Sequence, residues 1–355
     1  MEAIPSGNSP WPAVLAVIPC LNEAAHIDAI ARQVLKEAER IPLRLVIADG
    51  GSSDGTRAIA KALAAEDDRV IFLHNEKRIQ SAALNLAAQR FGSGAGFLIR
   101  IDAHCRYPDR FCESLLEEQA ATGADSIVVS MAAEGGTCFQ RAAAAAQNSV
   151  LGNGGSAHRR SSSGRFTDHG HHALMRLTAF QAVGGYDETF SHNEDAELDM
   201  RLGAAGFRIW LAGMPPIGYF PRRSPRALFR QYVNYGRGRA RTLFKHGRRP
   251  KLRQSLPLAV APALPVAMLA PVHPIFAVPA LAWAGLCIAY GAFIGLKERD
   301  TCAAFSGVAA MIMHLGWSAG FLIQAAKLAA AGRPRGSAPA RGPVPASTAG
   351  DGTAR

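Results

Sequence analysis

The segment VLAVIPCLNE, residues 14–23, places a short apolar run directly before a polar turn. The apolar run predicts a buried strand, and residues 22–38 have the spacing of a helix. The same order recurs along the chain. We expect further strands at 43–48, 70–73, 97–101 and 127–130, and helices at 56–65 and 80–90. Strands that alternate with helices in this way predict an α/β fold, with a mostly parallel sheet covered on both faces.

Polar clusters follow three of these strands. Residues 19–23 end the first strand, residues 49–56 the second, and residues 100–104 the fourth. Because ligands of parallel sheets bind beyond the carboxyl ends of the strands, we expect the three clusters to share one site. Asp49 is placed to accept hydrogen bonds from a ribose hydroxyl or a base N–H, whereas Asp54 also suits a cap of the next helix.

Two further patterns suggest chemistry. Asp102 and His104 lie two residues apart after a strand, and such a pair can share a divalent metal that bridges a diphosphate. A capping aspartate with an incidental histidine is the alternative. Glu194 and Asp195 open a polar helix at 196–205, where four acids within six positions exceed what the helix dipole favours. A carboxylate there would serve as a general base.

Several classes are disfavoured by what the sequence lacks. A dinucleotide-binding fold needs GxGxxG after the first strand, but the residues there are PCLNEAA, and there is no Walker A motif. The six cysteines form no CxxC pair, which argues against a structural zinc site. We expect them to be buried or membrane-embedded thiols in a reducing compartment. Residues 1–10 contain no Lys or Arg, so no signal peptide is expected there.

The basic excess is concentrated in one segment. The net charge is +11, and residues 222–253 contain twelve Lys or Arg and no acid. Residues 256–296 then carry no charge at all. A basic segment beside an apolar run predicts a membrane anchor with the basic side in the cytoplasm, and not a nucleic-acid partner. The apolar run has room for two crossings, and the run 303–330 for a third. Prolines in the first part leave a re-entrant or surface-lying stretch as the alternative.

Five motifs in a fixed order carry a resemblance to a known family: VIPCLNEAAHI, ADGGSSDGT, RIDAH, GGYDE and NEDAELDMRL. They resemble the family 2 glycosyltransferases, inverting enzymes with the GT-A fold. The segments HNEKRIQSAALNLA, QNSVLGNGGSAHR and RQYVNYGRGRART are similar to membrane-anchored, succinoglycan-type glucosyltransferases of exopolysaccharide assembly. The resemblance implies a GT-A domain at 11–221, between a flexible N-terminus (1–10) and a basic juxtamembrane segment (222–254). A membrane region with two to three transmembrane helices (255–330) and a disordered tail (331–355) would follow.

The resemblance also implies residue roles. Asp195, of the pair Glu194–Asp195, would be the catalytic base. Asp102 and His104 stand where the family's Asp-x-Asp binds metal and diphosphate, with His104 in place of the second acid. The remaining contacts with the nucleotide-sugar donor would come from Pro19, Asn22, Glu23, Asp49 and Asp54, with Arg237 and Arg239 holding its phosphates.

The implied function is transfer of a single hexose, glucose, from a nucleotide-diphosphate sugar such as a UDP-sugar. The acceptor would be a polyprenyl-diphosphate-linked saccharide in exopolysaccharide biosynthesis, and the cofactor Mn²⁺ or Mg²⁺. The processive motif Gln-x-x-Arg-Trp is absent from residues 231–237, which favours one sugar per encounter. We expect the bacterial cytoplasmic membrane, with the catalytic domain facing the cytoplasm, and membrane lipids and other assembly proteins as partners. Alternatives are bare polyprenyl phosphate as acceptor, and a non-catalytic scaffold of the same fold.

Overall fold

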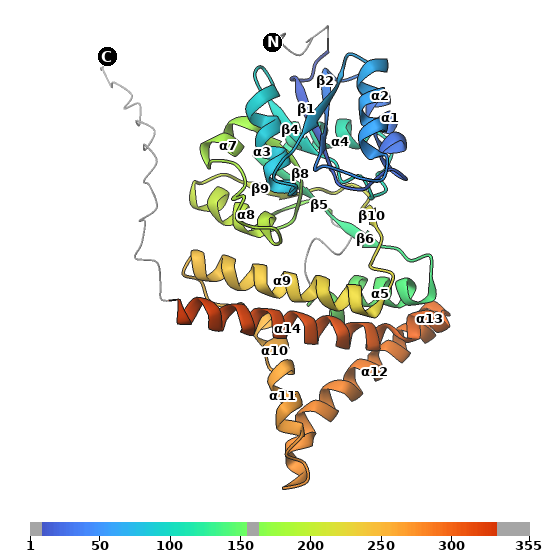
Figure 1. Ribbon diagram of the computed structural model, residues 1–355, viewed down its shortest axis with the longest axis vertical. Helices are drawn as coiled ribbons and strands as arrows, with labels where there is room; N and C mark the ends of the chain where they lie inside the picture. The colour runs from blue at the N-terminus through green and yellow to red at the C-terminus, as the bar shows by residue number, and fades with distance from the viewer. Residues whose placement is uncertain (1–8, 155–162, 332–355) are drawn as a thin grey trace, which may run out of the picture.

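The computed structural model describes residues 9–154 and 163–331 of the chain (Figure 1). The predicted flexible N-terminus and disordered tail fall outside these residues, apart from residues 9, 10 and 331. An eight-stranded sheet forms the centre of the α/β part of the chain, called the catalytic part because it contains the predicted catalytic residues, in the order β3-β2-β1-β4-β8-β5-β9-β7. The strands of this sheet are β1 (Val14–Cys20), β2 (Leu43–Asp49), β3 (Val70–His74), β4 (Phe97–Arg100), β5 (Ser126–Val129), β7 (Arg165–Thr167), β8 (His171–Arg176) and β9 (Ile209–Leu211). A separate parallel pair joins β6 (Met131–Ala133) to β10 (Ile217–Tyr219).

The sheet is mostly parallel, as predicted. Strand β1 pairs in parallel with β2 and β4, and its last residue, Cys20, lies opposite Asp49. The sequence did not predict β8, which runs antiparallel between β4 and β5. The carboxyl ends of β1, β2 and β4 therefore meet at one edge of the sheet, where the polar clusters follow.

Helices cover both faces of the sheet because successive side chains of each strand point to opposite sides. Val14, Ala16 and Ile18 of β1 pack in one apolar cluster with residues of α1 and α4, whereas Leu15 and Val17 pack in another with residues of α3 and α8. The covering helices are α1 (Ile27–Glu37), α2 (Thr56–Glu66), α3 (Gln80–Phe91), α4 (Phe111–Thr122), α7 (Leu177–Ala182) and α8 (Glu194–Ala204).

Helix α1 begins five residues later than predicted, at Ile27 and not at Asn22. Asn22 has a left-handed backbone (φ 59°), and its side chain accepts a hydrogen bond from the backbone N–H of Ser53 at 2.9 Å. The loop between β1 and α1 is thus tied to the loop after β2. A helical spacing of apolar residues could not reveal this constraint, because it comes from the other loop.

A helical layer lies beneath the catalytic part (Figure 1). Helices α9 and α14 run side by side, and their backbones touch at glycines: a Cβ on Gly236 would lie 2.1 Å from the carbonyl oxygen of Trp317, and one on Gly320 would lie 2.1 Å from that of Val233. The layer comprises α5 (Cys138–Asn148), α6 (Val150–Asn153), α9 (Pro225–Lys245), α13 (Thr301–Ala304) and α14 (Ser306–Ala330).

An apolar hairpin projects from this layer, away from the sheet (Figure 1). Its arms are α10 (Leu252–Leu258) with α11 (Val260–Ala267), and η2 (Pro274–Ala277) with α12 (Val278–Glu298). Its large apolar side chains are exposed, Leu286 by 71% and Leu296 by 79%. Such a surface is unfavourable in water and favourable in lipid.

The number of candidate spans falls within the expected two to three, but their positions differ from the expected pattern. Within the described residues, two helices are long and apolar enough to cross a membrane, Pro274–Glu298 and Thr301–Ala330. The run 256–296 therefore contains one helix of spanning length, not two. Prolines 257 and 265 fall inside α10 and α11 and interrupt the first arm. The other candidate is half buried against the rest of the protein, because it packs along α9.

The expectation that the cysteines are thiols is wrong for two of them. Cys138 of α5 and Cys302 of α13 form a disulfide across 164 residues. The ion pair between Arg141 and Asp300 joins the same two segments. Spacing along the sequence could not reveal this pairing. The two cysteines are 164 residues apart, and only the fold brings α13 back beside α5. Cys20, Cys112 and Cys287 are free and buried, as expected.

Candidate active site

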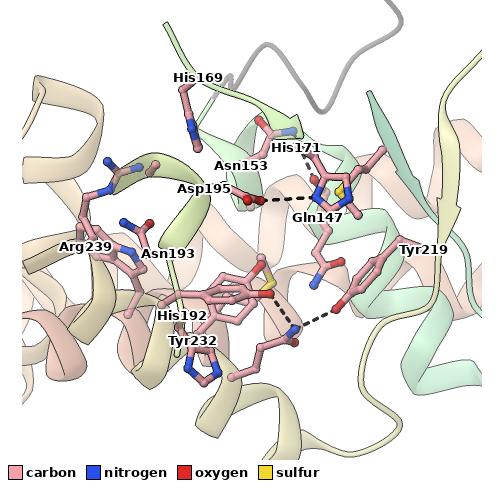
Figure 2. Close-up of a pocket in the computed structure, with 18 of the residues that line it drawn as sticks. Gln147, Asn153, His169, His171, His192, Asn193, Asp195, Tyr219, Tyr232 and Arg239 are labelled. Atoms are coloured by element: carbon pink, nitrogen blue, oxygen red, sulfur yellow. Dashed lines mark hydrogen bonds and ion pairs between the residues drawn. The ribbon is translucent and has the colours of Figure 1, made fainter. Parts of the chain in front are cut away.

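A cavity of about 530 Å³ lies between the carboxyl edge of the sheet and the helical layer (Figure 2). Asp102, His104, Glu194 and Asp195 line it from the catalytic side, and Arg239 lines it from α9. The volume is within the range of small-molecule sites. The structure thus brings together five of the residues that the sequence predicted, although they come from segments up to 137 residues apart.

The other predicted residues build two loops beside the cavity. Asp49 is fully buried and accepts hydrogen bonds from the N–H groups of Gly51 (3.1 Å) and Ser52 (3.0 Å) and from Nε of Arg57 (3.2 Å). Burial alone would raise the pKa of Asp49, but these hydrogen bonds lower it below its ordinary value. Asp49 therefore stays anionic at neutral pH, at the end of β2.

Asp54 joins the two loops. It accepts hydrogen bonds from the Thr56 hydroxyl (2.6 Å) and from the backbone N–H of Ala24 (3.1 Å), and these lower its pKa. Glu23 extends the β1 loop to the cavity, because its Oε1 lies 2.9 Å from Nδ1 of His104. Pro19 lies within β1, next to this loop.

Arg100 connects the two halves of the cavity. Its side chain is 5% exposed, with Nε 2.9 Å from Oδ1 of Asp102 and Nη1 2.9 Å from Oδ1 of Asp195. Tyr186 donates a second hydrogen bond to the same oxygen of Asp195, at 2.9 Å. Burial would raise the pKa of Asp102, but the charge of Arg100 and the nearby His171 lower it well below its ordinary range. One guanidinium therefore holds two carboxylates in fixed positions.

His171 lies between the same two carboxylates. Its Nε2 is 3.4 Å from Oδ2 of Asp102 and its Nδ1 3.7 Å from Oδ2 of Asp195, toward which it points in Figure 2. Burial, and then the charge of Arg100, lower the pKa of His171 to about 4, so the ring is neutral at pH 7. The two oxygens of Asp195 therefore differ, because Oδ1 contacts Arg100 and Tyr186, whereas Oδ2 faces His171.

Glu194 and Asp195 begin helix α8 after Asn193, whose backbone is left-handed (φ 67°). Both line the cavity. Burial and the adjacent charge of Asp195 raise the pKa of Glu194 to about 7. The two acids therefore differ: Glu194 has a raised proton affinity, whereas Asp195 is paired with Arg100.

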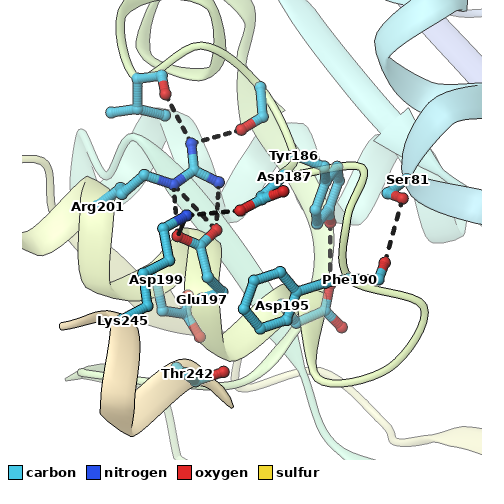
Figure 3. A network of polar contacts seen from close by, with 12 residues as sticks. Ser81, Tyr186, Asp187, Phe190, Asp195, Glu197, Asp199, Arg201, Thr242 and Lys245 are labelled. Atoms are coloured by element: carbon cyan, nitrogen blue, oxygen red, sulfur yellow. Dashed lines mark hydrogen bonds and ion pairs between the residues drawn. The ribbon is translucent and has the colours of Figure 1, made fainter. Parts of the chain in front are cut away.

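A second network fixes α8 to the helical layer (Figure 3). Glu197 is fully buried and lies 2.6 Å from Nη2 of Arg201, 2.6 Å from Nζ of Lys245 and 3.1 Å from Nε2 of His246. Burial would raise the pKa of Glu197, but the hydrogen bonds from His246, Arg201 and Lys245 lower it well below its ordinary value. Part of the basic excess thus pairs with the catalytic part and does not face a membrane surface.

Asp102 and His104 suit a divalent metal in their chemistry. Metal-bound histidines commonly donate the second ring N–H to a carboxylate, and Glu23 is in that position on Nδ1 of His104. Among residues 9–154 and 163–331, no group of three or more His, Cys, Asp or Glu side chains is arranged to hold a metal. An ion there would take its other ligands from a diphosphate and water, as Mg²⁺ and Mn²⁺ sites commonly do.

The predicted arginine pair is separated by the structure. Arg239 is half-buried and lines the cavity, but Arg237 is exposed and does not. Residues two apart on a helix point in nearly opposite directions, so α9 cannot present both to one site. Arg222, before α9, also lines the cavity.

Comparisons with known proteins agree with this geometry. The family described as "Glycosyl transferase family 2" matches residues 15–184. Over 307 residues, the chain is 56% identical to the succinoglycan biosynthesis protein ExoA of Rhizobium meliloti (strain 1021), which covers 86% of this chain and 93% of that protein. The chain belongs to the family 2 glycosyltransferases. The predicted family and enzyme class are thereby confirmed.

Two more relatives of this glycosyltransferase are informative. A polyprenol monophosphomannose synthase of Mycolicibacterium smegmatis (strain ATCC 700084 / mc(2)155) is 31% identical over 136 residues, which is 38% of this chain and 50% of that protein. The mannosyltransferase PcManGT of Pyrobaculum calidifontis, solved with GDP-Man and Mn²⁺, superposes with a TM-score of 0.52 at 18% identity. That match covers 86% of this chain and 87% of the other, and it confirms the GT-A fold.

Sequence reasoning missed Arg100 and His171 as site residues. Arg100 stands within the quoted motif RIDAH, and a charged residue that ends a buried apolar strand was the available signal. His171 belongs to the histidine-rich segment DHGHH, but the sequence did not show which of its histidines faces the site. Its two neighbours serve another carboxylate: His169 and His172 lie 2.6 and 2.8 Å from Asp199.

Arg100→Gln should shift the acid limb of the pH–rate profile upward. Arg100 lowers the pKa of Asp102, and an opposite charge at this distance is typically worth about 1–3 pKa units. Without it Asp102 ionises only at higher pH, so the acid limb should lie at higher pH than in the native chain. The profile is measured as sugar transfer between pH 4 and 9. Arg176→Gln removes a half-exposed ion pair with Asp125 and should leave the profile unchanged; equal profiles for all three proteins would contradict the assignment.

Glu197→Gln should destabilise the folded chain by about 1.5–3 kcal/mol, because it removes the buried charge that accepts hydrogen bonds from the partly exposed Arg201, Lys245 and His246. Because Glu197 has a lowered pKa in the folded state, its contribution is present above its unfolded pKa, about 4.3, and is lost as the pH falls through the folded value. Thermal unfolding in detergent measures the effect. Glu66→Gln, which removes an exposed pair with Arg32, is the control and should change little. Similar losses in both variants would refute the role of this network.

Proposed function

We propose that this glycosyltransferase transfers a single hexose, glucose, from a UDP-sugar to a polyprenyl-diphosphate-linked saccharide, as a step of succinoglycan-type exopolysaccharide biosynthesis. The observation that supports the proposal is the extent of the cavity. It reaches from Asp102 and Asp195 to Gln254 and Pro257 at the start of the apolar hairpin. A lipid-linked acceptor held by the hairpin can therefore present its sugar to the catalytic carboxylates. The relative ExoA, 56% identical, is named for succinoglycan biosynthesis.

The donor would bind at the carboxyl edge of the sheet. In this proposal Asp49 holds the ribose or the base, with Pro19, Asn22 and Glu23 lining the pocket and Asp54 supporting it. Asp102 and His104 would hold a Mn²⁺ or Mg²⁺ ion that binds the diphosphate, and Arg239 would add a cation from α9. A bound metal would offset the negative charge of the leaving diphosphate. The similarly folded PcManGT was solved with Mn²⁺, which supports a divalent ion here.

Asp195 would act as the base. Its Oδ1 is occupied by Arg100 and Tyr186, and its Oδ2 takes the proton of the acceptor hydroxyl. The acceptor oxygen forms a bond to the anomeric carbon from the face opposite the diphosphate. The bond from that carbon to the diphosphate oxygen breaks, the nucleoside diphosphate leaves, and the configuration inverts. Arg100 fixes the distance between Asp102, at the diphosphate, and Asp195, at the acceptor hydroxyl. The two substrates are thereby held in the orientation that the reaction needs.

The membrane part supports a lipid-linked acceptor. We infer that the apolar hairpin enters the bacterial cytoplasmic membrane and that the catalytic domain faces the cytoplasm, with anionic lipids near the exposed arginines of residues 222–254. Other exopolysaccharide assembly proteins would meet the enzyme there. The domain boundaries at 221 and 254 stay predictions.

Bare polyprenyl phosphate is the second candidate acceptor, since a polyprenol monophosphomannose synthase matches 38% of the chain. Incubation of membranes with labelled nucleotide sugars and native lipid extracts tests the proposal and separates the two acceptors. A labelled lipid diphosphate saccharide supports the proposal, and a labelled lipid monophosphate sugar supports the alternative. Absence of any lipid product would favour the scaffold.

Asp195→Asn should lower the transfer rate about 10²-fold or more and leave nucleotide binding intact, because a general base is removed while the carboxylates at the donor loops remain. Transfer rate and nucleotide affinity are measured on the same preparation. Asp28→Asn, on the exposed surface of α1, is the control. Near-native transfer by Asp195→Asn would show that another residue is the base, and Glu194 is the next acid in the cavity.

The metal assignment predicts an ordered series. Asp102→Ala should lose more activity than His104→Ala, because Asp102 supplies the negative charge, and His104→Asp should retain activity. Binding of Mn²⁺ to the purified chain with UDP, measured by electron paramagnetic resonance, should weaken in the same order. Full activity in excess chelator would exclude this role for Asp102 and His104.

A further inference from the structure

Two buried glutamines in the cavity have side-chain oxygens without partners. Gln147 of α5 is 2% exposed and Gln231 of α9 is 8% exposed, and both line the cavity. In the part of the chain that the structure describes, Oε1 of neither residue meets a hydrogen-bond partner. Buried polar atoms are nearly always satisfied, so two such oxygens in one cavity call for a donor from outside the protein.

Gln231 is held in place by its own amide. Its Nε2 donates to the hydroxyls of Tyr219 (2.8 Å) and Tyr235 (2.9 Å), which fixes the direction of the unpaired oxygen. If the two ends of the amide are exchanged, the unpaired group becomes the NH₂ end, and a ligand hydroxyl satisfies it as an acceptor. The rings of Tyr232 and Tyr235 lie beside it, with centroids 5.4 Å apart. Figure 2 shows Tyr219 and Tyr232 among the residues around the cavity, with Gln147.

The membrane side of the cavity is also fixed. His314 of α14 donates from Nε2 to the carbonyl oxygen of Leu151 at 2.7 Å and accepts at Nδ1 from the indole N–H of Trp283 at 3.2 Å. Trp283 belongs to the hairpin helix α12, and Leu151 and His314 line the cavity. These contacts join the hairpin to the cavity wall, so the two glutamines face a preformed space.

We propose that Gln147 and Gln231 bind hydroxyl groups of a neutral pyranose, the terminal sugar of the acceptor. The assignment rests on the proposed function. Unpaired carbonyl oxygens need donors, and sugar hydroxyls are donors without charge. Aromatic rings supply flat apolar surface for the sugar face.

The position of the glutamines fits an acceptor. The cavity reaches Asp195, which takes a proton from the attacking hydroxyl, and Gln254 and Pro257, at the start of the hairpin. A pyranose bound by the glutamines therefore shares one space with the base and with the first apolar helix. The glutamines thus select which sugar meets the base.

The test uses the purified full chain with UDP and two probes, methyl β-D-glucopyranoside and methyl β-D-galactopyranoside, observed by saturation-transfer NMR. The native chain should bind at least one probe, and Gln147→Leu should weaken that binding about tenfold or more. The deoxy form of the bound probe that lacks the contacting hydroxyl should bind weakly to the native chain and no more weakly to the variant. Gln231→Leu should weaken binding as well.

Gln119→Leu is the matched control. Gln119 is also buried, but its amide donates to the carbonyl oxygen of Ala124, away from the cavity. This variant should melt at a lower temperature and bind the probe normally. Gln147→Leu should melt at the native temperature or higher, because it replaces an unpaired buried oxygen with an apolar group.

Equal probe binding by the native chain and Gln147→Leu overturns the proposal. Displacement of the probe by UDP-glucose, with a raised KM for that donor in Gln147→Leu, would assign the glutamines to the transferred sugar and overturn it too. The readout is separate from turnover: a native chain that turns over no nucleotide sugar refutes the proposed function, whereas probe binding lost in Gln147→Leu still supports the sugar site.

Discussion

A single buried guanidinium, Arg100, sets the geometry on which the site depends. Asp102 follows the end of β4 and Asp195 begins α8, and no backbone pairing joins these two elements. Two carboxylates so close together repel each other and are costly to bury unless a cation lies between them. Arg100 provides that cation with hydrogen bonds of 2.9 Å to each, and Tyr186 and His171 fill the remaining space. The spacing between the diphosphate side and the acceptor side of the reaction follows from this contact.

A second set of ion pairs joins the site to the helices from which the apolar hairpin projects. Glu197, two residues after Asp195, binds Lys245 and His246 at the end of α9, so the helix that carries the proposed base is fixed to the helical layer. Helix α9 in turn touches α14 at Gly236 and Gly320. The cavity is therefore bounded on one side by the charged groups of the candidate site and on the other by helices continuous with the apolar hairpin. In the proposed reaction, a water-soluble donor and a lipid-linked acceptor would meet there without either leaving its own phase.

The sequence predicted the parts of the fold that local patterns determine. Strands β1 to β4 are continuous apolar runs, and their order with the helices gives the parallel sheet. Asp102, His104, Glu194 and Asp195 lie at element ends, where motifs show them. What the sequence could not show depends on distant partners: the late start of α1 at the Asn22–Ser53 contact, the Cys138–Cys302 bond, and the ion pairs of Arg100. Arg237 illustrates the same limit, because charge count alone did not show that α9 turns it away from the cavity.

The anomeric configuration of the product tests the account most directly. If Asp195 and the diphosphate lie on opposite sides of the reacting carbon, as the proposed roles of Asp195 and Asp102 place them, an α-linked nucleotide sugar must yield a β-linked product. Proton NMR of the first product formed by the purified chain, from an α-linked UDP-sugar and the lipid-linked acceptor, measures this through the coupling constant of the anomeric proton. The account predicts a β linkage only. An α-linked product would show attack from the diphosphate side and contradict the assigned roles of both aspartates.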